Sequence, residues 1–144
     1  MLFGCLTLHA SADCFEEAGR HFGVSPELLR GIDYVESRGR DRAVNRTHLG
    51  TTQSYDIGRT QINSRWLPTL AKYGLSEGDL YDACTNIHVG AWILSDLIRR
   101  YGDTWNAVGA YNAACSKLKG DDCTKQRARY AWDVYRAMQR RHSK

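Results

Sequence analysis

No stretch of this 144-residue sequence approaches the roughly 18 consecutive apolar residues that a membrane-spanning helix needs, so we expect no transmembrane segment. The sequence also lacks a Cys-x-x-Cys pair and a histidine pair at zinc-ligand spacing, so we expect no metal site. It has neither a long basic run nor interleaved aromatic residues of the kind that stack on bases, which argues against nucleic-acid binding. Internal repeats and low-complexity linkers are absent from the sequence too. Its length and the absence of linkers indicate a single domain.

The composition is that of a globular protein, with 25% charged and 42% hydrophobic residues. The net charge of +4 is modest and would favour an anionic partner such as a cell-wall polymer, a nucleic acid or a membrane surface. The excess is uneven, because residues 117–144 contain nine Lys and Arg against three Asp. We interpret this basic tail as the solvated face of a helix.

The first 12 residues, MLFGCLTLHASA, are mostly apolar and end in small side chains. This pattern is typical of the end of a secretory signal with a cleavage site before Asp13. No Lys or Arg follows Met1 and the apolar run is short, so a short buried N-terminal segment is the alternative. We expect residues 1–12 to be a signal-peptide remnant and residues 13–144 to form the domain.

The cysteine count fits an exported protein. Cys5 falls in the predicted leader, and an even number of cysteines remains: Cys14, Cys84, Cys115 and Cys123. Two disulfides are the simplest interpretation in an oxidising compartment, whereas in the cytosol these would be ordinary buried thiols. Four cysteines allow three pairings that sequence alone does not distinguish. Our preferred hypothesis pairs Cys14 with Cys84 and Cys115 with Cys123.

Helical periodicity dominates the chain. The apolar spacing, with Ser25 and Thr85 as N-caps, predicts helices over residues 14–22, 26–39, 65–73, 85–102, 104–113 and 125–141. The last of these is predicted to turn one apolar face inward, made of Ala131, Val134, Tyr135 and Met138.

Residues 40–63 differ from the rest of the chain, because Gly, Thr, Ser and Asn cluster there between short β-prone pieces. We predict a small hairpin or irregular sheet in this region. The predicted fold class is therefore mainly α with a small β insertion, an α+β fold.

Glu36 is the first candidate for catalytic chemistry. It follows Ile32 by four residues and Leu29 by seven, so it borders the apolar face of its helix. A carboxyl group on that border is partly desolvated, which raises its pKa towards the range that a general acid needs. The alternative is an ordinary surface glutamate, which is what most helical glutamates are.

Asp56 lies 20 residues further on, within the predicted β insertion. A pair of carboxyl groups facing one another is the arrangement that glycoside hydrolysis uses. Amides suit sugars because they both donate and accept hydrogen bonds, and Gln61 and Asn63 supply two. Trp66 and Tyr111 would offer flat apolar faces to sugar rings. The alternatives are turn-stabilising amides and core aromatics.

Three motifs together resemble the lysozyme-like lytic transglycosylases: YVES (34–37), DIGRTQINSRW (56–66) and AYNA (110–113). The subgroup that the sequence resembles comprises the small invasion-protein IagB-like enzymes of bacterial type III and type IV secretion and pilus systems. The similarity extends over residues 13 to about 138, so it implies a lysozyme-like fold. NIHVGAWIL (86–94) is similar to the family helix that packs beneath the substrate cleft.

The resemblance also implies roles for individual residues. Glu36 would be the catalytic acid and base, with Tyr111 reaching towards it. The remaining motif positions would contact substrate, namely Ser37, Gly58, Gln61, Asn63, Trp66 and Asn112.

The sequence departs from the transglycosylase pattern at three places. Gly-Arg-Thr-Gln (58–61) replaces the common Gly-Leu-Met-Gln, and AYNAA replaces AYNAG, with Cys115 next. Many transglycosylases also have no second acid, whereas Asp56 matches the second catalytic carboxylate of animal-type lysozymes. The chain therefore resembles an intermediate between the two groups.

The resulting expectation is a peptidoglycan lytic transglycosylase that needs no cofactor and cleaves between N-acetylmuramic acid and N-acetylglucosamine with a 1,6-anhydro product. The alternatives are a lysozyme-type muramidase and a non-catalytic wall-binding component. The resemblance further implies a periplasmic location and a protein partner in a secretion or pilus apparatus.

Overall fold

The computed structural model of the protein describes residues 10–115 and 118–143. Its elements, in chain order, are α1 (Ala10–Phe22), α2 (Pro26–Ser37), β1 (Val44–Asn45), α3 (Leu49–Thr52), β2 (Asp56–Ile57), β3 (Ile62–Asn63), η1 (Ser64–Trp66), α4 (Leu67–Ala71), η2 (Gly78–Tyr81), α5 (Ala83–Tyr101), α6 (Trp105–Asn112) and α7 (Gly120–His142). The mainly α fold with a small sheet is confirmed.

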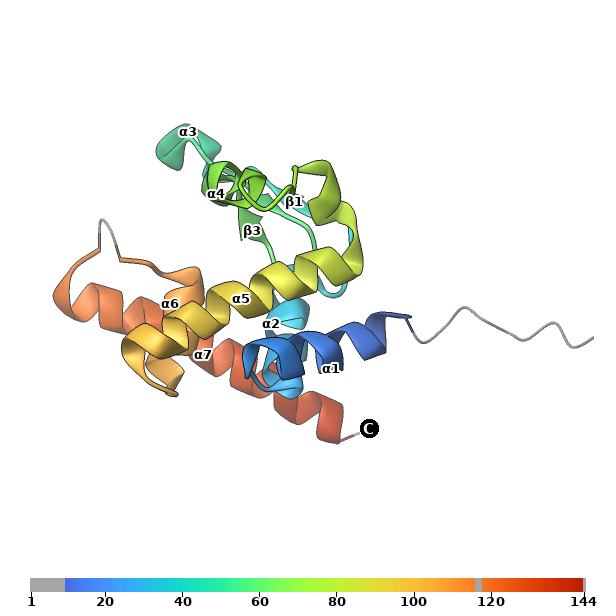
Figure 1. Ribbon diagram of the computed structural model, residues 1–144. Coiled ribbons are helices and arrows are strands. Elements are labelled where there is room, and N and C mark those ends of the chain that lie inside the picture. The colour runs from blue at the N-terminus through green and yellow to red at the C-terminus, as the bar shows by residue number, and fades with distance from the viewer. Residues whose placement is uncertain (1–9, 116–117, 144) are drawn as a thin grey trace, which may run out of the picture.

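Helix α5 runs between two parts of the molecule (Figure 1). We call α1, α2, α6 and α7 the helical lobe, and we call residues 40–82, which contain the strands, the β wing. One side of α5 supplies Ile87, Ala91 and Leu94 to the core of the helical lobe. Val89 and Ile93 pack instead with the apolar residues of the β wing. Because both cores share α5, the two parts are fixed relative to one another.

The helix ends follow from local chemistry. Ser25 caps α2 by accepting a hydrogen bond from the Leu28 amide at 3.3 Å, as the sequence predicts, and Thr104 caps α6. The predicted cap of α5 is wrong by three residues, because Asp82 accepts the bond from the Thr85 amide at 2.8 Å. Asp82 has the extended backbone that a cap needs, whereas Thr85 is already helical.

Several predicted boundaries also need correction. The segment predicted as one helix over residues 65–73 divides into η1 and α4, and α7 begins five residues before the predicted start at residue 125. The predicted β insertion contains an unexpected short helix, α3. Tyr135 does not belong to the inner face of α7, because it is 38% exposed, whereas Val134 is fully buried.

The strands form an antiparallel sheet in the order β1-β2-β3. Val44 pairs with Ile57 and Ile57 with Ile62, whereas Asn45 pairs with Asp56 and Asp56 with Asn63. Ile57 and Ile62 are buried against α5, and the alternation of side chains along a strand puts Asp56 and its paired asparagines on the opposite face. The sheet therefore presents a polar row that includes the candidate carboxylate.

Asn86 on α5 holds the β2-β3 turn in place. Its side-chain nitrogen donates to the carbonyls of Ile57 at 3.0 Å and Leu80 at 2.9 Å. Its side-chain oxygen accepts from the Thr60 amide at 2.8 Å and from the Thr60 hydroxyl at 2.7 Å. Asn86 and Thr60 are both fully buried, so these bonds form away from water. The amide of Asn86 thus fixes the β wing to the central helix.

The four cysteines of the domain form the two disulfides that we preferred. Cys14 is bonded to Cys84, with 5.3 Å between their Cα atoms, and this bond joins α1 to the first turn of α5. Cys115 is bonded to Cys123, with 5.6 Å between their Cα atoms, and this bond joins the segment after α6 to α7. The predicted pairing is confirmed.

Within the described ranges, no helix is long and apolar enough to cross a membrane. The same residues contain no group of three or more His, Cys, Asp or Glu side chains placed to hold a metal ion.

Gly58 tests the role of the Asn86 contact. Its φ is +75°, and a Cβ atom there would lie 2.2 Å from the Asn86 side-chain nitrogen and 2.5 Å from the Leu80 carbonyl oxygen. We predict that Gly58→Ala lowers the free energy of unfolding by about 3 kcal/mol or more, since it combines backbone strain with displacement of a buried hydrogen-bonded amide.

Gly74→Ala is the matched control, because Gly74 has φ +77° and a Cβ atom added there would meet nothing within 4 Å. Gly74→Ala should lower the free energy of unfolding by only roughly 1 kcal/mol, which is the cost of holding a non-glycine residue at positive φ. Urea unfolding of both variants measures the difference. Equal losses would contradict a special role for the Gly58–Asn86 contact.

Candidate active site

Glu36 lies in the last turn of α2 and is half-buried. The hydroxyl of Tyr130 donates a hydrogen bond of 2.6 Å to Glu36 Oε1. Burial raises the pKa of Glu36 from its ordinary 4.5 to about 7; the bond from Tyr130 lowers it and the negative charge of Asp56 raises it. A large share of Glu36 therefore carries a proton near neutral pH.

Tyr130 is a site residue that sequence reasoning missed. It lies on α7, is 6% exposed, and reaches Glu36 across 94 positions of the chain. Burial and the Glu36 charge raise the pKa of its phenol well above the usual value, so it remains a hydrogen-bond donor. Its helical spacing with Val134 marks it as an inward-facing residue, but no feature of the sequence identifies its partner.

Asp56 begins β2, and both of its carboxylate oxygens accept hydrogen bonds. Asn63 Nδ2 on the neighbouring strand donates to Oδ1 at 2.8 Å, and His48 Nε2 lies 2.7 Å from Oδ2. The carboxylate is therefore held from two sides. Since its charge raises the pKa of Glu36, the two carboxyl groups lie within electrostatic reach of one another.

The partners of Asp56 are themselves connected in a closed ring of side chains. His48 Nδ1 lies 2.7 Å from the Thr52 hydroxyl, Ser54 donates to that hydroxyl at 3.0 Å, and Asn63 Nδ2 lies 3.1 Å from Ser54 Oγ. Short helix α3 brings His48 and Thr52 together at a spacing of four residues. The sequence prediction of an irregular sheet here left no reason to suspect His48.

Tyr111 on α6 approaches the site from the side of the helical lobe. Its hydroxyl donates to the Thr60 carbonyl at 2.9 Å, which connects α6 to the β2-β3 turn. Burial raises the pKa of its phenol, and the charges of Glu36 and Asp56 raise it further. Tyr111 therefore lies near both carboxyl groups, although its hydrogen bond goes to the backbone.

The other predicted substrate contacts in this region make hydrogen bonds within the protein. Gln61 Nε2 donates to the carbonyls of Gly58 at 2.8 Å and Ala43 at 3.2 Å, and Gly58 is buried against Asn86. Ser37 is 1% exposed; its hydroxyl donates to the Asp33 carbonyl at 3.3 Å and closes the end of α2. The bonds of Gln61 and Ser37 therefore hold the backbone near the two carboxyl groups.

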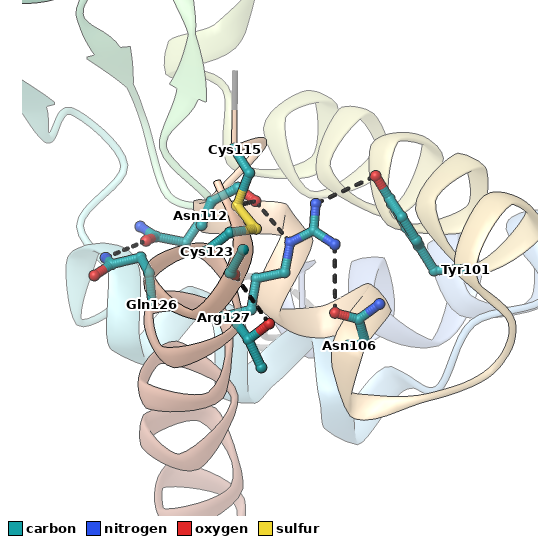
Figure 2. The surroundings of a disulfide bond; sticks show 10 residues. Tyr101, Asn106, Asn112, Cys115, Cys123, Gln126 and Arg127 are labelled. Carbon is teal, nitrogen blue, oxygen red and sulfur yellow. Dashed lines mark hydrogen bonds between the residues drawn. A yellow bond between two sulfur atoms is a disulfide. The ribbon is translucent and has the colours of Figure 1, made fainter. Parts of the chain in front are cut away.

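The two remaining predicted contacts are Trp66 in η1 and Asn112 at the end of α6. Trp66 is half-buried and packs edge-to-face on Trp92, with ring centres 5.4 Å apart, within the apolar cluster of the β wing. Asn112 is exposed at the end of α6, where its side-chain oxygen accepts from Gln126 at 3.3 Å beside the Cys115–Cys123 disulfide (Figure 2).

The departure from the family pattern at Arg59 has a physical explanation. Arg59 makes a bidentate ion pair with Asp33 of α2, with Nε–Oδ1 at 2.7 Å and Nη2–Oδ2 at 2.8 Å. Asp33 is buried, so the planar guanidinium satisfies a carboxylate that would otherwise lack a counter-charge. The transglycosylase pattern commonly has an apolar residue at the position of Arg59. In this chain the ion pair at that position joins the β wing to α2.

The chain is similar in sequence to known proteins. The sequence profile of the family described as "Transglycosylase SLT domain" matches residues 13–131. The chain is 42% identical over 130 residues to invasion protein IagB of Salmonella typhimurium, covering 90% of this chain and 79% of that protein. It is 40% identical over 129 residues to X polypeptide of Escherichia coli K12, covering 89% and 73% respectively.

A third relative is protein IpgF of Shigella flexneri, with 38% identity over 126 residues that cover 87% of this chain and 78% of that protein. The family match spans most of the chain, including Glu36, the β wing and Tyr111. Its description implies an enzyme that cleaves glycan chains. The chain therefore belongs to the transglycosylase SLT domain family and has that family's lysozyme-like fold.

Proposed function

We propose that this protein is a peptidoglycan lytic transglycosylase that cleaves the β-1,4 bond between N-acetylmuramic acid and N-acetylglucosamine. The observation that carries the proposal is the Glu36 carboxyl group, hydrogen-bonded to Tyr130 and raised in pKa to about 7 by burial, within electrostatic reach of a second carboxylate held in place by two partners. Two carboxyl groups in different environments suit acid catalysis at one and charge stabilisation at the other.

The first step is proton transfer from Glu36 to the glycosidic oxygen. The Tyr130 hydroxyl donates to Oε1, so we assign the acidic proton to Oε2 and expect that oxygen to face the bond to be cleaved. As the proton moves, the bond between the anomeric carbon and the leaving oxygen breaks. Glu36 is left as a carboxylate that accepts the Tyr130 bond more strongly than before.

Asp56 stabilises the positive charge that develops on the anomeric carbon. Hydrogen bonds from Asn63 and His48 fix the position of its carboxylate before substrate arrives. A preorganised charge needs little rearrangement during the reaction, which is the main source of electrostatic catalysis. In this role Asn63 and His48 are positioning residues for Asp56.

The second step completes the transfer within the same sugar. The Glu36 carboxylate accepts the proton of the muramyl C6 hydroxyl while the C6 oxygen bonds to the anomeric carbon, which gives a 1,6-anhydro ring and restores protonated Glu36. If water takes the place of the C6 hydroxyl, the reaction is the hydrolysis of a lysozyme-type muramidase. The match of Asp56 to the lysozyme carboxylate keeps hydrolysis as the second candidate.

We further propose that the enzyme works outside the cytoplasm, in the periplasm, and opens the wall locally for a secretion or pilus apparatus. The two disulfides and a substrate in the cell wall support the location. The likeness to invasion protein IagB supports the association with an apparatus.

Mass spectrometry of digested peptidoglycan tests the reaction. We predict that the wild type produces 1,6-anhydro ends. Glu36→Gln should lower the cleavage activity by about 10²-fold or more, since an amide cannot donate the proton. Glu17→Gln, a change at an exposed glutamate of α1, is the matched control and should retain full activity. Reducing ends would identify a muramidase instead, and intact strands would identify a non-catalytic wall-binding protein.

Asp56→Asn tests the second carboxylate. We predict that turnover falls by about 10-fold or more, since a loss of 1.4 kcal/mol of transition-state stabilisation is a factor of ten. Asp82→Asn, at a carboxylate that caps α5, should leave turnover unchanged. Thermal unfolding verifies that both variants fold. Wild-type turnover in folded Asp56→Asn, with lower thermal stability, would reduce Asp56 to a structural residue.

A further inference from the structure

A hollow between α6 and α7 lies apart from the residues that the reaction uses. Its volume is about 370 Å³, and three of its aromatic side chains are exposed: Trp132 by 60%, Trp105 by 47% and Tyr135 by 38%. We call this hollow the α6/α7 groove; its remaining lining residues are Asn106, Thr124, Arg127, Ala128 and Ala131. Water-exposed aromatics clustered in this way mark an interaction site.

The aromatic rings form walls rather than a flat platform. The rings of Trp105 and Trp132 both meet Tyr135 edge-on, at centre distances of 5.7 and 5.5 Å and interplanar angles of 87° and 86°. A sugar ring binds best on an open flat face, whereas a hollow with angled walls fits a bulky apolar side chain. The geometry of the walls therefore favours a protein side chain over a glycan.

Arg127 lines this groove and is 8% exposed. Its guanidinium donates to the Ala113 carbonyl at 3.0 Å. It also donates to Asn106 Oδ1 at 3.3 Å and to the Tyr101 hydroxyl at 3.2 Å (Figure 2). All three partners are neutral. No carboxylate in the described part of the chain forms an ion pair with Arg127, whose guanidinium carbon lies 4.5 Å from the centre of the Tyr101 ring.

The rim adds to the positive charge. Arg129 and Arg136 lie three residues before and four after Trp132, so both flank it on the surface of α7, and both are exposed. Asp133 pairs with Arg136 at 2.5 Å and offsets part of this charge. Trp, Tyr and Arg are also the residue types that contribute most binding energy at protein interfaces.

We propose that the α6/α7 groove is a docking site for a segment of another protein that carries a bulky apolar side chain next to an Asp or Glu. The apolar side chain would enter between the aromatic walls, and the carboxylate would pair with the guanidinium groups of Arg127 or the rim. This inference names the surface for the partner suggested under the proposed function, but it stands on the groove alone and does not depend on catalysis.

Docking there would leave the carboxyl groups accessible. Tyr130, which bonds to Glu36, and Trp132 lie two positions apart on α7, so they point in directions about 200° apart around the helix. One side of α7 thus supports the catalytic acid while the other forms the groove. A partner could hold the enzyme in place without covering Glu36.

Selection from a display library of random short peptides on the full-length protein tests the proposal. We expect enriched peptides to combine a bulky apolar residue with Asp or Glu. Trp132→Ala should weaken their binding by about tenfold or more, while Tyr73→Ala, at an aromatic that is 72% exposed outside the groove, should not change it. Replacing the peptide's acid by its amide should weaken binding, and added salt should do the same.

Three results would overturn the proposal. The first is a selection with no Trp132-dependent binder, or binders without an acid. The second is saturation of the groove by an oligosaccharide of N-acetylglucosamine, detected as a change that Trp132→Ala abolishes. The third is a dimer in sedimentation that Trp132→Ala dissociates, which would assign the groove to a second copy. Peptidoglycan cleavage by Trp132→Ala should equal that of the wild type, so failure here is distinct from failure of the proposed reaction.

Discussion

The buried amide of Asn86 is the interaction on which the arrangement of the site depends. Its hydrogen bonds to Ile57, Thr60 and Leu80 fix the β2-β3 turn against α5, and α5 also belongs to the core of the helical lobe. Glu36 comes from that lobe, whereas Asp56 comes from the sheet that the turn closes. The positions of the two carboxyl groups relative to one another are therefore set by a contact that neither of them makes.

The same fold gives its two carboxyl groups different surroundings. Burial raises the pKa of Glu36 to about 7, although the hydrogen bond from the Tyr130 phenol lowers it. Asp56 sits on a half-buried strand and accepts hydrogen bonds from Asn63 and His48, which hold its charge in one place. Burial thus supplies the acid and hydrogen bonding supplies the fixed anion, which are the two groups that the proposed reaction needs.

Sequence patterns predicted the features that arise from local chemistry. Helical spacing located Glu36 on the border of an apolar face, and the β-prone segment around Asp56 is part of the small sheet. They did not predict the partners of these residues, because Tyr130 reaches Glu36 from a helix 94 positions away and His48 depends on a short helix in a region without helical periodicity. Tyr135 was assigned to the core since apolar spacing does not distinguish a buried aromatic from one that lines a surface groove.

The most direct test of the account is the titration of the Glu36 carboxyl group by ¹³C NMR, with the signal assigned through Glu36→Gln. The predicted midpoint is about pH 7 rather than the ordinary 4.5, because burial disfavours the ionised form. In Tyr130→Phe the midpoint should move higher, since the lost hydrogen bond favours the carboxylate. A midpoint near the ordinary value, or an unchanged one in Tyr130→Phe, would contradict the assignment of Glu36 as a proton donor maintained by burial.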